Sequence, residues 1–154
     1  MVSRGFTVIL ALMRIAAGLS LILAGLTKLG WFSSPAPLQQ SFQKFAANAA
    51  NPLVASYVAM VQPHAGLFSR LVPLGELGLG TLLLVGFLTP LAAILAFLMT
   101  LQFYFASSAL FTKAFYTPLG ASVYLLSFLV LFAGKAGTAL GIDGILGTRR
   151  QKSN

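Results

Sequence analysis

The sequence predicts an all-α membrane protein, a four-helix transmembrane bundle with interfacial helices between spans one and two. Three observations support this prediction. Of 154 residues, 58% are hydrophobic and only 8% are charged, whereas a soluble domain carries roughly 25% charged residues. The apolar residues gather in four long runs, and one longer, more polar segment separates the first two runs. We expect a single membrane domain over residues 1–154, because this length fits one domain.

The four runs have the length that a membrane requires. A bilayer core about 30 Å thick needs roughly 20 apolar residues in a helix. The expected spans are approximately residues 6–27, 68–88, 91–111 and 117–133. The first run exceeds the apolar stretch of about 7–15 residues that is typical of a signal peptide, so we expect it to be a retained helix. The fourth run is the shortest.

Spans two and three are joined only by Thr89 and Pro90. Proline is tolerated in the first turn of a helix, so this junction predicts an antiparallel helical hairpin. Glycine is also frequent in the spans, and small residues let membrane helices approach one another closely. These glycines are Gly18, Gly25, Gly75, Gly78, Gly80 and Gly86. We interpret them as helix-packing positions.

The segment 30–67 is the only long connection. Apolar residues recur there at helical spacing, which gives one apolar face, at Leu38, Phe42, Phe45 and Ala49. Asn51 and Pro52 resemble an N-cap and a first-turn proline, which predicts a second short helix that stops at Pro63. We expect both helices to lie in the membrane interface with their apolar faces toward the lipid. They would form either a lid over the bundle or a docking platform for a partner.

The basic residues indicate an orientation for the chain. An even number of spans places both termini on one side, together with Arg4, Arg149, Arg150 and Lys152. The opposite side holds Lys28, Lys44, Arg70 and Lys113. The positive-inside rule then favours cytoplasmic termini in the cell inner membrane. The net charge of +8 does not indicate nucleic acid, because the cations are scattered rather than clustered on one face; the basic tail instead suits an anionic membrane surface.

The composition excludes several kinds of chemistry. Cysteine is absent, which excludes thiolate nucleophiles, disulfide exchange and iron–sulfur clusters. His64 is the single histidine, and Glu76 and Asp143 are the only acidic residues. We therefore expect no catalytic residue, no metal site and no intrinsic cofactor.

The charges inside the spans are the candidate functional residues. An intramembrane charge costs at least about 2.5–3.5 kcal/mol and therefore faces the bundle interior and pairs. Arg14 lies about 12 Å from one membrane boundary, and Glu76 lies about 12 Å from the other, near Lys28. Arg14 and Lys28 are fourteen residues apart, nearly four turns, and so share one helical face. This placement predicts a shared site around Glu76.

Polar side chains of similar depth complete this candidate site, namely Gln102, Tyr104 and Tyr124. Two interpretations remain open. Hydrogen-bond donors between aromatic walls would suit a quinone headgroup. Alternatively, Arg14, Lys28 and Glu76 form a structural ion network that fixes the register of the helices.

Three stretches of the chain resemble the DoxX family of small four-helix membrane proteins. They are RIAAGLSLILAGLTKL, which contains Arg14 and Lys28, PLGELGLGTLLLVGFLTPLAA around Glu76, and the tail GKAGTALGIDGIL with Asp143. The family is related to the small subunit of thiosulfate:quinone oxidoreductase. The resemblance implies a membrane subunit of a redox system. The chain departs from the family pattern in its long segment 30–67, which favours a specialised partner.

Two functions follow as hypotheses. In the first, the chain is an accessory subunit that stabilises or docks a larger membrane redox complex with other membrane subunits. In the second, it binds quinone and passes electrons from a partner oxidoreductase to the membrane pool. We favour the first, because the chain has no redox side chain of its own. A transporter would require an inverted repeat, which the sequence does not show.

Overall fold

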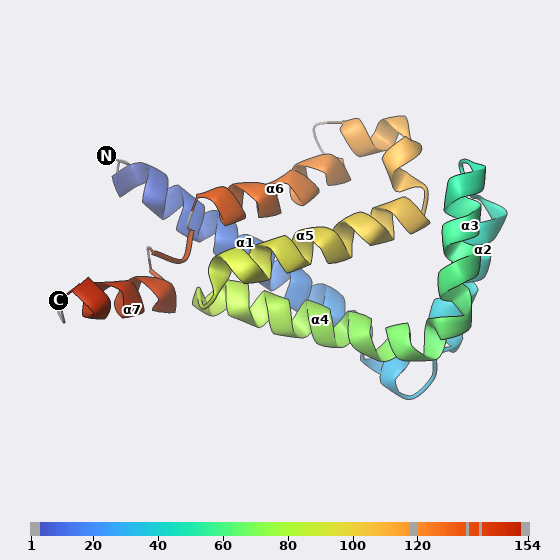
Figure 1. Cartoon of the computed structure of the whole chain (residues 1–154), viewed down its shortest axis with the longest axis horizontal. Helices are drawn as coiled ribbons and strands as arrows, with labels where there is room; N and C mark the ends of the chain where they lie inside the picture. Colours follow the sequence, from blue (N-terminus) through green and yellow to red (C-terminus); the bar gives the residue numbers. More distant parts are fainter. Residues whose placement is uncertain (1–3, 118–119, 135, 139, 152–154) are drawn as a thin grey trace.

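The computed structural model describes residues 4–117, 120–134, 136–138 and 140–151, which contain helices and turns and no strand. The longer helices, which run alongside one another (Figure 1), are α1 (Arg4–Thr27), α4 (Ala65–Val85), α5 (Thr89–Ala106) and α6 (Ala121–Ala133). Helices α2 (Ala36–Ala47) and α3 (Pro52–Val61) form a hairpin across one end, and α7 (Ile142–Gln151) lies at the other. Short 3₁₀ helices cover Leu29–Phe32, Gln62–His64, Ala109–Phe111, Lys113–Tyr116 and Ala136–Thr138.

Among the described residues, three helical stretches are long and apolar enough to cross a membrane. They are Gly5–Thr27, Pro52–Val85 and Thr89–Ala106. Many leucines of these helices point outward; Leu12 in α1, for example, is 59% exposed and Leu98 in α5 is 52% exposed. Together with the length of the helices, an outward apolar surface of this kind is typical of contact with lipid. The chain is therefore an all-helical integral membrane protein, as the composition predicted.

The third and fourth predicted runs are shorter than expected. Helix α5 ends at Ala106 rather than near residue 111, because Ser108 adopts a left-handed conformation with φ of 62°. Two 3₁₀ helices follow, and α6 begins only at Ala121. Its 13 residues extend about 20 Å, less than a bilayer core of about 30 Å.

The turn between α4 and α5 is tight, as predicted. Helix α4 ends at Gly86, whose φ of 70° gives it the left-handed conformation of a helix C-cap. Leu88 is also left-handed, with φ of 49°. Thr89 and Pro90 form the first turn of α5 rather than the connection itself. The two helices consequently run antiparallel and side by side (Figure 1).

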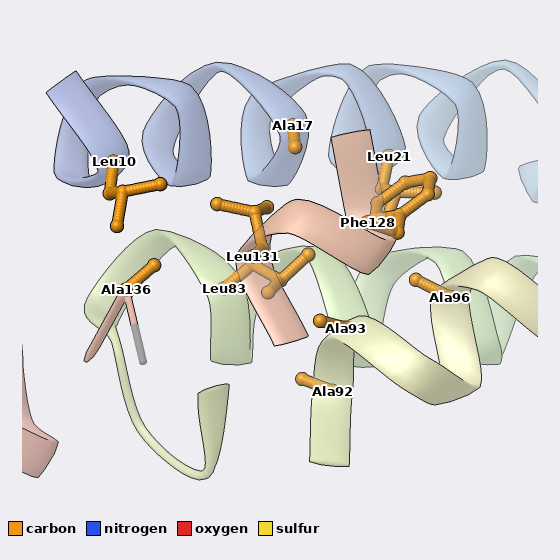
Figure 2. Close-up of a cluster of buried hydrophobic side chains, with 10 residues drawn as sticks. All are labelled: Leu10, Ala17, Leu21, Leu83, Ala92, Ala93, Ala96, Phe128, Leu131 and Ala136. Carbon is orange, nitrogen blue, oxygen red and sulfur yellow. The ribbon is translucent and has the colours of Figure 1, made fainter. Parts of the chain in front are cut away.

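One hydrophobic cluster joins α1, α4, α5 and α6. Figure 2 shows side chains from these helices converging, with Leu83 and Leu131 between Leu10 on one side and the alanines of α5 on the other. Ala92, Ala93 and Ala96 are fully buried, so small side chains allow α5 to lie close to its neighbours. This core keeps α6 attached to the three longer helices.

A second cluster lies under the α2–α3 hairpin. Leu38 and Phe42 of α2 pack against Val54 and Val58 of α3 and against the end of α5. Phe42 is only 7% exposed. The prediction of two short helices is confirmed, but the prediction that the apolar face of α2 turns toward lipid is wrong, because that face covers α3 and α5. This part of the segment covers the ends of α4 and α5, so Phe42 is not accessible to a partner.

Candidate functional site

An ion pair joins α1 to α4. The ammonium group of Lys28, one residue beyond α1, donates to Oε1 and Oε2 of Glu76 at 2.6 and 2.7 Å. It also lies 3.3 Å from the carbonyl oxygen of Ala24 and 5.8 Å from the centre of the Trp31 ring. The Lys28 and Glu76 side chains are 19% and 11% exposed. The expected pairing of these two residues is confirmed, and both carboxylate oxygens are occupied by it.

Glycines bring the backbones of α1 and α4 close enough for this pair to form. A Cβ at Gly18 would lie 2.8 Å from the carbonyl oxygen of Gly80, and a Cβ at Gly80 would lie 2.8 Å from that of Gly18. Nearer the pair, a Cβ at Gly25 would lie 3.2 Å from the Cβ of Glu76. Side chains at these positions would therefore separate the helices. Gly78 differs, because nothing lies within 4 Å of its hypothetical Cβ.

Arg14 lies in a different environment from Glu76. Its guanidinium is fully buried, and Nη2 donates to the carbonyl oxygen of Leu140 at 2.9 Å. Gly86 and Gly141 leave room for it, since a Cβ on either would overlap its Nη1 atom. Nε and Nη1 have no hydrogen-bond partner among the described residues. Asp143 interacts electrostatically with this guanidinium.

Asp143 closes the turn between α4 and α5. Its Oδ1 accepts from the backbone N–H of Leu88 at 2.8 Å, and Oδ2 accepts from that of Thr89 at 2.9 Å. These N–H groups begin α5, where no helical partner exists and a negative charge is favoured. Its own backbone N–H donates to the carbonyl oxygen of Gly86 at 2.9 Å. A residue of α7 thereby supplies the N-terminal cap that α5 lacks in its own sequence.

The structure does not bring Arg14 and Glu76 into a shared site. Arg14 and Lys28 are separated by a rise of about 21 Å at helical spacing, and the two side chains have different acceptors, the carbonyl of Leu140 and the carboxylate of Glu76. The prediction of a shared site, made from the distances of Arg14 and Glu76 to the membrane boundaries, was wrong because it considered only side chains within the spans. The carbonyl of Leu140, which accepts from Arg14, belongs to a segment beyond the fourth apolar run.

Gln102 and Tyr104 lie on α5 but have different surroundings. Gln102 accepts a hydrogen bond from the Tyr57 hydroxyl at 3.2 Å, beside a cavity of about 20 Å³ between α2, α3, α4 and α5. That volume suits about one water molecule and no ring. Tyr104 packs edge-on against Phe115, with ring centres 5.4 Å apart.

Tyr124 borders a groove between α1 and α6 of about 410 Å³. Its walls are mostly small or apolar, with Met13, Ala16 and Val123 among them. The hydroxyl of Ser20 lies 2.9 Å from that of Tyr124 and forms the polar part of the groove. The groove has the volume of a small-molecule site.

Sequence reasoning missed Ser20, Tyr57 and the capping role of Asp143. One signal could have revealed Asp143. The start of α5 contains no acidic residue, and the chain has only one other carboxylate, Glu76. In the described part of the chain, no three His, Asp or Glu side chains come together as metal ligands would.

These features define a class of protein, a helical integral membrane protein whose charged residues join its helices to one another. A profile of the DoxX family matches residues 9–109. This match covers most of the chain, which therefore belongs to the DoxX family. Tyr124 and Asp143 lie beyond the matched residues. No curated protein and no solved structure matches the chain.

Proposed function

We propose that this chain is an accessory subunit that stabilises or docks a larger redox complex in the inner membrane. The observation that carries the proposal is that both carboxylates of the chain already have partners within it. Lys28 occupies both oxygens of Glu76, and backbone N–H groups occupy both oxygens of Asp143. These carboxylates hold helices in place and are not free for catalysis. Membership of the DoxX family supports a redox partner, as the resemblance implies.

The docking surface that we propose is the outer face of α3. Leu53 and Met60 are 68% and 64% exposed there. Phe42 of α2, by contrast, is buried and not accessible to a partner. A protein partner with an apolar patch at the membrane surface would cover them.

The test is co-purification in mild detergent from cells that carry the tagged chain as their only copy. We expect a flavin-, haem- or iron–sulfur-containing protein to co-purify, and the Leu53→Ser/Met60→Ser variant to lose it. The matched control is Leu23→Ser, because Leu23 is 63% exposed on α1. A chain that purifies alone, or an α3 variant that retains its partner, would contradict the proposal.

Quinone binding is the second candidate function, and the groove between α1 and α6 favours it. Of the six residues proposed for a quinone pocket, Tyr124 lines this groove. Arg14, Lys28, Glu76, Gln102 and Tyr104 are not among its lining residues. A quinone ring could lie on Ala16 and Val123 with a carbonyl near the hydroxyls of Ser20 and Tyr124.

A quinone analogue should then stabilise the purified protein. At 100 times its dissociation constant, a ligand adds about 2.7 kcal/mol to the folded state. We expect Tyr124→Phe to reduce the resulting rise in Tm. Tyr116→Phe is the control, because Tyr116 is exposed outside the groove. No shift with the unmodified protein would leave the accessory role as the better account.

We further propose four membrane crossings, with both termini on the cytoplasmic side. Helix α6 would make the fourth crossing, and because it is shorter than a bilayer core, residues that precede it would span the remaining thickness. Figure 1 supports this arrangement, because the start of α1 and helix α7 lie at the same end of the long helices. The α2–α3 hairpin, which runs across the other end, would lie in the opposite membrane interface.

A further inference from the structure

The hydroxyl groups of Ser20 and Tyr124 meet in the groove between α1 and α6. Ser20 Oγ lies 2.9 Å from the carbonyl oxygen of Ala17 and 2.9 Å from the hydroxyl oxygen of Tyr124. A serine hydroxyl has one hydrogen to donate, and a tyrosine hydroxyl has one as well. Two hydrogens are therefore shared among three oxygen atoms, and their arrangement decides what the groove offers to a ligand.

Only one arrangement gives both hydrogens an acceptor. When Ser20 donates to the carbonyl of Ala17, the Tyr124 hydroxyl donates to Ser20 Oγ, and both O–H groups are paired. When Ser20 donates to Tyr124 instead, the phenolic hydrogen has no acceptor among the hydrogen bonds of the described residues. Ser20 belongs to the stretch Gly5–Thr27, which is long and apolar enough to cross a membrane, and lipid chains supply no acceptor. The first arrangement is therefore the more stable one, because an unpaired polar group in apolar surroundings costs free energy.

The hydroxyl oxygen of Tyr124 then presents lone pairs to the groove and no hydrogen. Its ring is held in position by an edge-on contact with Phe128, with ring centres 5.0 Å apart, and Phe128 is fully buried. Ser127, the other hydroxyl residue that lines the groove, donates to the carbonyl of Tyr124 at 2.6 Å. The hydroxyls of the groove can therefore accept a hydrogen bond from a ligand, but their own hydrogens are already used.

We infer that this groove binds an aromatic ring that carries a hydroxyl group more tightly than the same ring with a carbonyl group, and thus a hydroquinone more tightly than its quinone. The inference rests on the second candidate function, the binding of a quinone ring in this groove. A hydroquinone donates to Tyr124 and leaves the bonds of both hydroxyls intact. A quinone carbonyl needs a donor, and Tyr124 can donate to it only by giving up its bond to Ser20.

The complex with the quinone consequently contains one hydrogen bond fewer than the complex with the hydroquinone. One hydrogen bond of ordinary strength corresponds to a difference of about two- to tenfold in the dissociation constant. The preference depends on the Ser20 hydroxyl in a specific way, because Ser20 is the acceptor that occupies the Tyr124 hydrogen. Removal of the Ser20 hydroxyl should free that hydrogen for a carbonyl and so improve the binding of the quinone.

The test uses duroquinone and duroquinol, which share one tetramethyl ring, in anaerobic detergent solution. The dissociation constant of each is obtained from the rise in Tm with ligand concentration. The ratio of the two constants is then compared among the unmodified protein, Ser20→Ala and Tyr124→Phe. This comparison removes any difference between the two ligands in their partition into detergent, because that difference is the same for every variant.

We expect the ratio to favour duroquinol about two- to tenfold more in the unmodified protein than in Tyr124→Phe. Ser20→Ala should also lose the preference, and it should bind duroquinone more tightly than the unmodified protein does. Ser69→Ala is the matched control. Ser69 also donates to the carbonyl three residues earlier, that of Gly66 at 2.9 Å, but it lies on α4 and does not line the groove. This variant should keep the ratio of the unmodified protein.

Two results would overturn the inference and leave the binding of a quinone ring in the groove intact. One is an equal ratio in the unmodified protein and in Tyr124→Phe, and the other is weaker binding of duroquinone to Ser20→Ala. If neither ligand raises the Tm of the unmodified protein, the inference and the second candidate function are both wrong.

Discussion

Glu76 and Lys28 stabilise one another in a largely buried ion pair, with side chains 11% and 19% exposed. Glu76→Leu should therefore cost about 3 kcal/mol, because an unpaired buried cation remains. Lys28→Met in the same chain should recover most of this loss. The measurement is thermal unfolding in detergent.

Arg14→Met is the control for this prediction. Its hydrogen bond goes to Leu140, so its effect should add to that of Glu76→Leu rather than reduce it. Recovery of stability by Arg14→Met would show that the two networks act as one.

Asp143 should contribute as much to the stability of the fold as the charged residues inside the spans do. Asp143→Ala removes two acceptors at the start of α5 and the carboxylate near Arg14. Loss of a cap costs about 0.5–2 kcal/mol, and the unpaired guanidinium should bring the loss to about 2 kcal/mol or more. A double-mutant cycle with Arg14→Met measures the coupling between them. Additive effects would contradict an electrostatic attraction between Asp143 and Arg14.

The sequence predicted the interaction partners of some of these residues but not of others. Lys28 and Glu76 could be paired from helix lengths alone, because both belong to or adjoin apolar spans that are readily recognised. Arg14 could not be placed, because its acceptor is a backbone carbonyl 126 positions away. Every residue has a backbone carbonyl, so the sequence does not indicate which one accepts from Arg14. Hydrophobic periodicity does not predict where the C-terminal segment packs. The quinone pocket itself stays a prediction.

Helices α1 and α4 depend on their glycines. Gly18→Ala should cost about 1–3 kcal/mol, because its Cβ would meet the backbone of Gly80 and Leu84 at 2.8 Å. Gly78→Ala is the matched control within α4. It has open space and should be neutral or slightly stabilising, since alanine favours a helix. Equal losses of Tm in the two variants would contradict the proposed close approach.

Helix ends were harder to predict than helices. The Asn51–Pro52 signal was correct, as the Asn51 side chain accepts from Val54 N–H at 3.0 Å. The end of α5 was placed too late, because residues 107–111 are as apolar as a helix interior except for two serines. The left-handed Ser108 is stabilised by contacts of its hydroxyl with Ala50 and Asn48. These contacts come from another part of the chain, so composition could not reveal them.

The number of membrane crossings can be measured directly, because the chain lacks cysteine. Single variants Ser34→Cys, Thr112→Cys and Leu140→Cys would place a reactive thiol at exposed positions. With four crossings, an impermeant maleimide should label Ser34→Cys and Thr112→Cys from one side and Leu140→Cys from the other. Labelling of Thr112→Cys and Leu140→Cys from the same side would show that α6 does not cross.

The cap that Asp143 provides for α5 has a consequence for the order of synthesis. The last residues of α4 and α5 are synthesised 58 and 37 residues before Asp143, counted from the helix bounds. Until then, the N–H groups of Leu88 and Thr89 lack the carboxylate that caps them, and Arg14 lacks the carbonyl of Leu140. A nascent chain that stops before α7 would retain its apolar helices but expose an uncapped turn and an unpaired guanidinium. A membrane protease that recognises such groups would distinguish truncated chains from finished ones.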